Sequence, residues 1–406
     1  MKILFIQHAG ALGGSTYSLL LLMRGLARRG YRPEVALVHP AADVRGLYAD
    51  EGFPVHDAPR IGIFAHTTGG WAHLRSVASI RQFMNTLYRW RSGQEATIRL
   101  VQRVNPDLVH LNSVVLCPSA IALRKEGVPF VWHVRECPPF QGARTSFIRR
   151  HLLNSPQVIF LSEYDRRQWT KSTHGTILPN SVDFSKIDEA PTRNEARKLL
   201  GLGPVSPVVL YLGGVVMIKG FHVLLEAALE VVEKRADALF LMPGSEIRLA
   251  ERGLKRTVQR ILPYFNMGTG AQRVLRFIRE NGLEHSVRLL PFAKDVMPYF
   301  AACDVLVFPS VLPHFARPVI EASAFGKPVI GSDIGGVREL IEPGRTGILC
   351  RPGDPEDLAS GILRLLNDRE GSVRIGAAAR ETASRMYGAD RYLEKIIAIY
   401  NQTDGM

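Results

Sequence analysis

The sequence has few cysteines and no long hydrophobic run. Its four cysteines in 406 residues, Cys117, Cys137, Cys303 and Cys350, are scattered without the spacing of a metal site, so we expect a reducing compartment. No apolar run approaches the roughly 20 residues that a membrane-spanning helix needs. The first apolar stretch, Lys2 to Gln7, is too short for a signal peptide. These absences predict a cytoplasmic protein.

Acidic residues are scarce relative to basic ones. The chain has 51 Lys and Arg against 38 Asp and Glu, a formal net charge of +13, which favours an anionic partner. Nucleic acid is disfavoured because there is no zinc-finger spacing, no basic region with heptads and no aromatic RNA-binding signature. A membrane surface or an acidic substrate remains. The hydrophobic content of 46% is that of an ordinary globular protein, and the length permits two or three domains.

Short apolar runs alternate with amphipathic segments, as in parallel α/β sheets whose strands are buried on both faces. The expected strands are 2–7, 34–38, 54–56, 107–112, 128–133 and 158–162 in the first half, then 208–212, 239–242, 287–291 and 305–308. Residues 185–207, rich in Pro, Gly and charge, separate the halves. We therefore predict two doubly wound, Rossmann-like domains, 1–186 and 187–388, and a final helix in 389–406.

The clearest motif runs from Val305 to Cys350 and reads as strand, loop, helix, strand, helix, strand. Its first helix begins at Arg317 or Pro318. A helix that opens at the carboxyl end of a strand presents free N–H groups and a positive dipole end, which suits a phosphate. Glu321, one turn further, can accept hydrogen bonds from a sugar. Chemistry alone leaves two interpretations open: a nucleotide-sugar site, or a solvated helix glutamate.

A glycine-rich loop follows the first strand. It contains Gly13 and Gly14 and leads into a helix, 15–29, that Ser15 or Thr16 can cap. The loop lacks the spacing G-x-G-x-x-G, and Glu34 lies at the start of the second strand rather than at its end. A nicotinamide site is therefore disfavoured. A tight strand-to-helix turn remains the plain alternative to a phosphate loop.

Two segments combine apolar and basic residues at helical spacing, 72–91 and 247–279. The first carries Trp71, Tyr88 and Trp90 beside its arginines, and the second is the densest basic region of the chain. Each is explained either by a solvated basic helix or by a helix that touches an anionic membrane at the inner face.

The motif at 305–350 resembles the signature of the retaining glycosyltransferases of family 4, which have the GT-B fold. The matching positions are Pro309-Ser310, Glu321, Gly326-Lys327-Pro328-Val329, Gly335-Gly336, Glu339 and Thr346-Gly347. The segment WHVRE around His133 and the segment PNSVD at 179–183 are similar to family motifs of the first domain. The resemblance implies two Rossmann-like domains that face a cleft. It also implies a nucleotide sugar held mainly by the second domain and a glycan or lipid-linked acceptor held mainly by the first.

The resemblance, together with our own substitutes for two positions where this sequence departs from it, gives a set of site residues. The predicted catalytic residues are His133, Lys219 and His314, the donor-binding residues are Gly13, Gly14, Gly213, Lys219, Arg317, Pro318, Val319 and Glu321, and the acceptor-side residues are Arg135 and Glu136. His314 and Arg317 are the two substitutes. We expect no cofactor and no metal, because no Asp-x-Asp element stands where a metal-dependent transferase needs one. Lys219, the helix start and the glycine loop would instead meet the charge of the diphosphate.

Four positions depart from the family pattern: Ser181, Gly214, Pro313 and Ala316. Two of them bear on donor binding. Pro313 stands where the family has the first glutamate of a pair, and Gly214 stands where it has an arginine. Arg317 is our candidate for the missing charge and His314 for part of the sugar contact, although an imidazole offers fewer acceptor sites than a carboxylate. We therefore predict a retaining, metal-independent glycosyltransferase of cell-surface polysaccharide synthesis. Two alternatives remain: an impaired GT-B protein that binds a sugar nucleotide or a partner enzyme, and a sugar-nucleotide epimerase.

Overall fold

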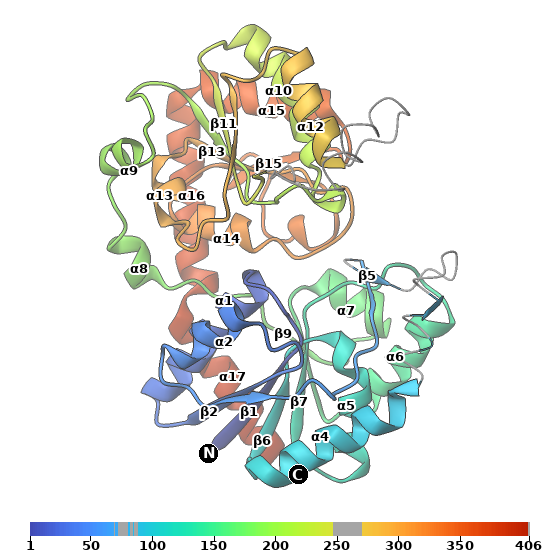
Figure 1. Ribbon diagram of the computed structural model, residues 1–406. Coiled ribbons are helices and arrows are strands. Elements are labelled where there is room, and N and C mark those ends of the chain that lie inside the picture. Colours follow the sequence, from blue (N-terminus) through green and yellow to red (C-terminus); the bar gives the residue numbers. More distant parts are fainter. Residues whose placement is uncertain (69, 72–79, 82–83, 85–87, 247–269, 405–406) are drawn as a thin grey trace. The chain divides into compact units, whose positions relative to one another are not determined.

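The computed structural model describes residues 1–68, 70–71, 80–81, 84, 88–246 and 270–404 (Figure 1). Contacts between Cα atoms divide the chain into two compact units. The first comprises Met1–Asp183, Pro313–Arg317 and Met386–Met406, and the second comprises Phe184–Leu312 and Pro318–Arg385. Each unit is built around one parallel sheet, as the alternation of apolar and amphipathic segments predicts.

The first unit has a seven-stranded sheet of order β3-β2-β1-β6-β7-β8-β9. Its strands are β1 (Lys2–Gln7), β2 (Arg32–Leu37), β3 (Val55–Asp57), β6 (Leu108–Leu111), β7 (Phe130–Val134), β8 (Gln157–Phe160) and β9 (Thr176–Ile177). Every pairing in this sheet is parallel. The chain builds outward from β1 to β3 and then returns to the other side of β1 with β6. The strand order therefore reverses between β1 and β6.

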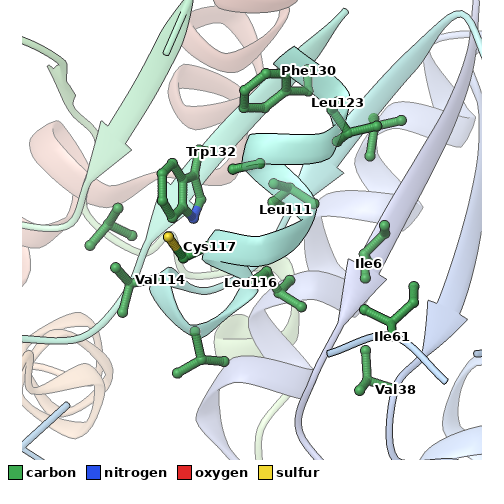
Figure 2. Packing of buried hydrophobic residues seen from close by; sticks show 14 of the residues in the cluster. Ile6, Val38, Ile61, Leu111, Val114, Leu116, Cys117, Leu123, Phe130 and Trp132 are labelled. Carbon is green, nitrogen blue, oxygen red and sulfur yellow. The ribbon is translucent and has the colours of Figure 1, made fainter. Parts of the chain in front are cut away.

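Helices cover both faces of this sheet. They are α1 (Gly14–Arg28), α2 (Ala42–Ala49), α4 (Trp90–Val104), α5 (Cys117–Lys125), α6 (Ala143–Leu153), α7 (Glu163–Thr170) and α17 (Ala389–Asp404), with a 3-10 turn η1 (Val114–Leu116) and a small hairpin of β4 (His66–Thr67) and β5 (Gly70–Trp71). On one face Ile6, Leu111 and Trp132 pack with residues of α5 (Figure 2). Each such side chain contributes roughly 1.5–3 kcal/mol when fully buried.

The other face packs against α1 and α17, the red helix that returns to the first unit in Figure 1. The contact is close at Gly25, where an added Cβ would lie 2.5 Å from Leu393 Cδ1. Ile396 and Tyr400 of α17 are fully buried in this cluster. The end of the chain is thus part of the core of the first unit.

The second unit has a six-stranded parallel sheet of order β12-β11-β10-β13-β14-β15. Its strands are β10 (Val208–Leu210), β11 (Leu239–Pro243), β12 (Val287–Leu290), β13 (Val305–Phe308), β14 (Val329–Ser332) and β15 (Gly347–Cys350). Its helices are α8 (Phe184–Asp188), α9 (Arg193–Leu199), α10 (Phe221–Lys234), α12 (Gly270–Glu280), α13 (Met297–Ala302), α14 (Arg317–Ala324), α15 (Pro355–Asn367) and α16 (Arg369–Tyr387). Here the strand order reverses between β10 and β13.

Most predicted strands lie within two residues of their expected bounds, and the predicted β1 and β13 agree at both ends. Two local predictions are wrong. The second helix expected between 331 and 347 is only a 3-10 turn, η4 (Gly335–Val337), because a glycine pair leaves no run of helix-forming residues. The cap of α1 is Gly13 rather than Ser15 or Thr16, since the helix begins one residue earlier.

Only part of the two basic segments, 72–91 and 247–279, belongs to the described residues. The residues 72–79, 82–83, 85–87 and 247–269 lie outside the described residues, and most of both predicted basic helices falls there. Among the residues that are described, no helix combines the length and apolarity required to cross a membrane.

Candidate active site

In the second unit, the loops that follow β10 and β13 are joined where the strand order reverses. The Ser310 hydroxyl and the Val311 amide donate to the Ile218 carbonyl at 2.9 and 3.0 Å. Gly220 packs directly on the other loop, because a Cβ there would lie 1.7 Å from the Pro309 carbonyl oxygen. Ligands of open α/β sheets bind in the crevice at such a reversal. The edge beyond β10 and β13 is therefore the candidate site of this unit.

Lys219 ends a 3-10 turn in the first of these loops, η2 (Met217–Lys219). The Tyr211 hydroxyl lies 3.2 Å from the Lys219 carbonyl and 3.1 Å from that of Gly214, which holds the turn in place. Burial lowers the pKa of the Lys219 ammonium, and no neighbouring carboxylate raises it. No carboxylate oxygen of a described Asp or Glu lies within 4.0 Å of Lys219 Nζ. A half-buried cation without a counter-ion is suited to bind a phosphate.

The two glycines before Lys219 are required by the shape of the loop. A Cβ at Gly213 would lie 2.0 Å from the Tyr211 hydroxyl oxygen. Gly214 has a φ of +64°, a conformation that side chains disfavour. The arginine that the family pattern places at 214 would therefore be strained in this loop.

Glu321 lies in the buried face of α14. It is 9% exposed, and Val319 and Ala322 beside it are fully buried. The interpretation of Glu321 as a solvated helix glutamate is therefore wrong. Pro318 occupies the second position of α14, where its missing N–H costs no helical hydrogen bond. The helix start and Glu321 thus lie on the loop side of β13, as expected of a site for a phosphate and a sugar.

Sequence reasoning missed one polar group near this edge. Ser245 follows β11 and is fully buried, and its hydroxyl has no hydrogen-bond partner among the described residues. Its position just after a strand is the only sequence signal, and that signal is weak because most such serines serve turns.

Residues 313–317 of the β13–α14 loop group with the first unit. There the Arg317 guanidinium donates through Nη1 to the Gly14 carbonyl at 3.1 Å and to the Ser18 hydroxyl at 2.6 Å. His314, in the same loop, is half-buried. Gly13 caps α1 through a reciprocal pair with Thr16, whose hydroxyl accepts from the Gly13 N–H at 2.9 Å and donates to the Gly13 carbonyl at 2.7 Å. The free N–H groups of α1 begin at this turn.

His133 lies in β7 and belongs to a buried chain of three polar side chains. Its Nδ1 is 3.3 Å from His110 Nε2, and His110 Nδ1 is 2.8 Å from the Tyr400 hydroxyl. All three residues are fully buried, and His133 Nε2 has no partner. Burial lowers the pKa of His133 well below its usual value and that of His110 to about 3, so both rings are neutral at physiological pH. If Tyr400 donates, His133 Nε2 carries a proton. If Tyr400 accepts, Nε2 is a base.

Arg135 and Glu136 follow β7 and have different surroundings. Arg135 donates through Nη1 to Asn112 Oδ1 at 3.2 Å and through Nη2 to Asn180 Oδ1. The Glu136 carboxylate accepts from the Ser113 hydroxyl at 2.6 Å and from the amides of Val114 and Arg135 at 3.1 and 3.2 Å. Glu136 therefore anchors the start of η1, while Arg135 spans the strand ends.

None of the predicted site residues forms a metal centre with its neighbours. Among the described residues, no group of three His, Cys, Asp or Glu side chains can hold a metal ion. The four cysteines are buried, and none of them is in a disulfide. Burial raises the pKa of Cys303 to about 11, so this thiol is not activated as a nucleophile or a ligand.

Two family models match the chain. Glycosyltransferase Family 4 covers residues 12–186, and Glycosyl transferases group 1 covers residues 192–382. A D-inositol 3-phosphate glycosyltransferase of Nocardia farcinica is 30% identical over 208 residues, which are 50% of this chain and 42% of that protein. The enzyme of the same name from Xylanimonas cellulosilytica is 25% identical over 97% of this chain and 92% of its own. The chain thus spans about half the length of the first of these curated relatives.

A solved structure extends the likeness to the whole fold. HepE of Anabaena, in complex with UDP-glucose, has 22% sequence identity and a TM-score of 0.76, and the superposition covers 99% of both chains. The two family models together cover both units, and the sheets have the topology that the motifs predict. The chain therefore belongs to the family 4 glycosyltransferases and has their GT-B fold.

Proposed function

We propose that the protein is a retaining, metal-independent glycosyltransferase that moves a sugar from a nucleotide sugar to a glycan or lipid-linked acceptor in cell-surface polysaccharide synthesis. The observation that carries this proposal is Lys219, a half-buried ammonium at the β10–β13 reversal with no described carboxylate beside it. Such a cation is suited to the diphosphate of a nucleotide sugar. The UDP-glucose bound to the HepE relative supports a donor of this class.

The donor site is proposed to work through fixed charge. Lys219 supplies a point charge, and the start of α14 supplies backbone N–H groups and a positive dipole end. Both stabilise the leaving diphosphate as its bond to the sugar breaks, and both are in place before the reaction begins. Because these groups can neutralise the diphosphate, a divalent ion is unnecessary. Glu321 is proposed to accept hydrogen bonds from the ribose.

The acceptor side is proposed to lie in the first unit. His133 offers a neutral imidazole whose Nε2 is unpartnered, and the His110–Tyr400 pair fixes the orientation of the ring. Such a group can position a hydroxyl or accept its proton. Retention of the anomeric configuration is proposed because the family transfers by front-face attack assisted by the leaving phosphate.

A lipid-linked acceptor would bring the protein to a membrane. Ile80, Met84 and Tyr88 are 44%, 58% and 87% exposed, and Arg81 and Arg89 beside them are exposed as well. We propose that these residues bind the inner face of an anionic membrane. Co-sedimentation with phosphatidylglycerol vesicles, but not with phosphatidylcholine vesicles, tests this. Equal recovery in both would contradict it.

One alternative is favoured by specific observations. Pro313 has no side-chain acceptor, and the strained position of Gly214 excludes the arginine of the family pattern. An impaired protein that binds a sugar nucleotide without transferring it would be free to lose both groups. Retention of Lys219, Glu321 and His133 favours the active enzyme.

The experiment is a transfer assay with a panel of nucleotide sugars and membrane-extract acceptors, in which release of nucleoside diphosphate and sugar products is measured. We expect one donor to be consumed, and we expect Lys219→Met to lose this activity while Lys198→Met, an exposed lysine of α9, retains it. Nucleotide binding without turnover of any donor would establish the binding protein. An epimerised sugar nucleotide as product would establish the epimerase.

A further inference from the structure

We propose that the first unit contains an oxyanion subsite centred on Arg135, and that it binds a phosphate or carboxylate group of a substrate. The assignment of that group to a transfer reaction rests on the proposed function. The subsite itself rests on the charge, burial and hydrogen bonding of residues within the first unit.

The guanidinium of Arg135 has only neutral partners. It donates hydrogen bonds to the amide oxygens of Asn112 and Asn180 and to the phenol oxygen of Tyr392. No described carboxylate forms an ion pair with it. Glu136, the adjacent residue, uses both carboxylate oxygens on Ser113, Val114 and the Arg135 amide. Burial lowers the pKa of Arg135, and the Arg317 charge adds to this effect, although Tyr392 and the Glu136 carboxylate act in the opposite direction. The surroundings therefore disfavour the charge on balance. An anion would remove that penalty.

Arg135 also stands where a ligand is expected. The first sheet reverses its strand order between β1 and β6, the position at which open α/β sheets bind ligands. Gln7 ends β1, Asn112 follows β6 and Arg135 follows β7. Asn112 Nδ2 donates to Gln7 Oε1 at 2.8 Å, and Asn112 Oδ1 accepts from Arg135. The three side chains therefore form one chain of hydrogen bonds across the reversal.

Several buried polar atoms beside this chain of hydrogen bonds are potential donors that lack an acceptor. Gln7 is fully buried; its Oε1 accepts from Asn112, and its Nε2 has no partner among the described residues. The buried atoms His133 Nε2 and His8 Nδ1 likewise have no partner in the described part of the chain. Buried polar atoms of a folded protein normally have hydrogen-bond partners, so three such atoms near a cation point to a missing acceptor. An oxyanion accepts from Gln7 Nε2, and it accepts from His133 Nε2 in the tautomer in which Tyr400 donates to His110.

The geometry of Arg135 suits a forked contact. The asparagines hold Nη1 and Nη2, which fixes the plane of the guanidinium. Of its five N–H groups, those not engaged by the two asparagines and by Tyr392 remain for a ligand. A planar guanidinium that is already oriented binds phosphate or carboxylate through two parallel hydrogen bonds with little further loss of freedom. The alternative is a purely structural role, in which Arg135 donates to Asn112 and Asn180 and binds no ligand.

The test measures the binding of inorganic phosphate to the full-length chain, in a Lys219→Met background that removes the other proposed phosphate site. Calorimetry and thermal shift should both detect phosphate. Arg135→Gln should weaken this binding at least tenfold, and Arg103→Gln, an exposed arginine of α4, should not. The thermal shift without phosphate shows whether Arg135→Gln is folded, and the affinity is compared only for the folded variant. Retained phosphate binding in folded Arg135→Gln would overturn the proposal.

A second variant keeps the test decisive if Arg135→Gln does not fold. Gln7→Glu preserves the acceptor that Asn112 uses and places a negative charge beside the subsite. It should fold, because it supplies the missing counter-charge, and it should bind phosphate at least tenfold more weakly. Unchanged phosphate affinity in Gln7→Glu would contradict the subsite.

Two substrates can supply the anion, and UDP distinguishes them. If Arg135→Gln in the otherwise unchanged chain weakens UDP binding tenfold, the group is the diphosphate of the donor. If UDP affinity is unchanged and the acceptor KM rises at least tenfold, the group belongs to the acceptor. Arg135-dependent phosphate binding in a protein that transfers no sugar would refute the proposed function and leave the subsite standing.

Discussion

Replacement of Gly220 by alanine should damage the donor site through a single steric contact. Gly220 follows Lys219 and has a φ of +74°. An alanine Cβ would lie 1.7 Å from the Pro309 carbonyl oxygen and 2.7 Å from its carbon. The obstacle is backbone, so it cannot rotate away. Either the loop of Lys219 or the end of β13 must move.

The destabilisation caused by Gly220→Ala has a conformational and a steric component, and a matched glycine separates them. Gly282 has a φ of +65° but no atom within 4 Å of the position of a Cβ. Gly282→Ala therefore isolates the left-handed conformation, which costs about 1 kcal/mol. Gly220→Ala adds overpacking of about 2 kcal/mol, for a total of about 3 kcal/mol. In a domain of this size, 1 kcal/mol lowers Tm by roughly 2–4 °C.

The assay is differential scanning calorimetry of the full chain, combined with titration of the nucleoside diphosphate of the donor that the transfer assay selects. We expect a Tm decrease of about 3 °C for Gly282→Ala and about 9 °C for Gly220→Ala in the transition of the second unit. Because Lys219 moves with the loop, the affinity for this nucleoside diphosphate should fall at least tenfold in Gly220→Ala alone, or about 1.4 kcal/mol. Equal Tm values for the two variants, with unchanged nucleoside diphosphate affinity, would refute the reasoning.

Four further outcomes are expected. Glu321→Ala should weaken nucleoside diphosphate binding at least tenfold, since charge-assisted hydrogen bonds contribute roughly 1.5–3 kcal/mol each. Transfer should survive EDTA, because Lys219 and the start of α14 meet the diphosphate charge. His314→Ala should reduce transfer by about 2 kcal/mol in transition-state stabilisation and leave diphosphate affinity unchanged. Acidification from pH 7 to pH 5 should destabilise the first unit, by at most about 2 kcal/mol from His66, and His66→Gln should remove this part of the dependence while the part from the buried His110 and His133 remains.

The sign of the pH effect follows from burial. His66 is fully buried, and burial lowers its pKa to about 4, against about 6.5 in the unfolded chain. Between these values the unfolded state binds more protons, so stability falls as pH falls. His285→Gln, at an exposed position, is the control and should keep the dependence of the parent.

For each of the other three predictions, one result would contradict it. Unchanged diphosphate affinity in folded Glu321→Ala would remove Glu321 from the site. A complete loss of transfer in EDTA that Mg²⁺ restores would show that the phosphate site is misassigned. Transfer at the parental rate in His314→Ala would make His314 an ordinary loop residue.

Local sequence determined the strands and their parallel arrangement. Val305–Phe308 and Lys2–Gln7 are short apolar runs with little alternation, and a strand buried on both faces must be apolar on both faces. The same reasoning failed where local signals are weak. The helices α2, α4 and α7 were not expected, and the glycine pair at 335–336 was expected to lie in a helix. Glu321 is predicted as a site residue from its place one turn inside a helix that follows a strand, and Lys219 from the pair Lys219-Gly220, which resembles a family motif. Both signals are local in the sequence.

Only the tertiary structure determined the surroundings of those residues. His110 and Tyr400 are 290 positions apart, yet their side chains lie 2.8 Å from one another and complete the chain that ends at His133. Arg135 looks like any arginine in the sequence, and its lack of a carboxylate partner emerges only when three strand ends are brought together. Hydrophobic periodicity reports which face of an element is buried, because burial acts on each residue separately. Charge compensation and hydrogen-bond satisfaction are properties of groups from distant segments, so the sequence carries no local signal for them.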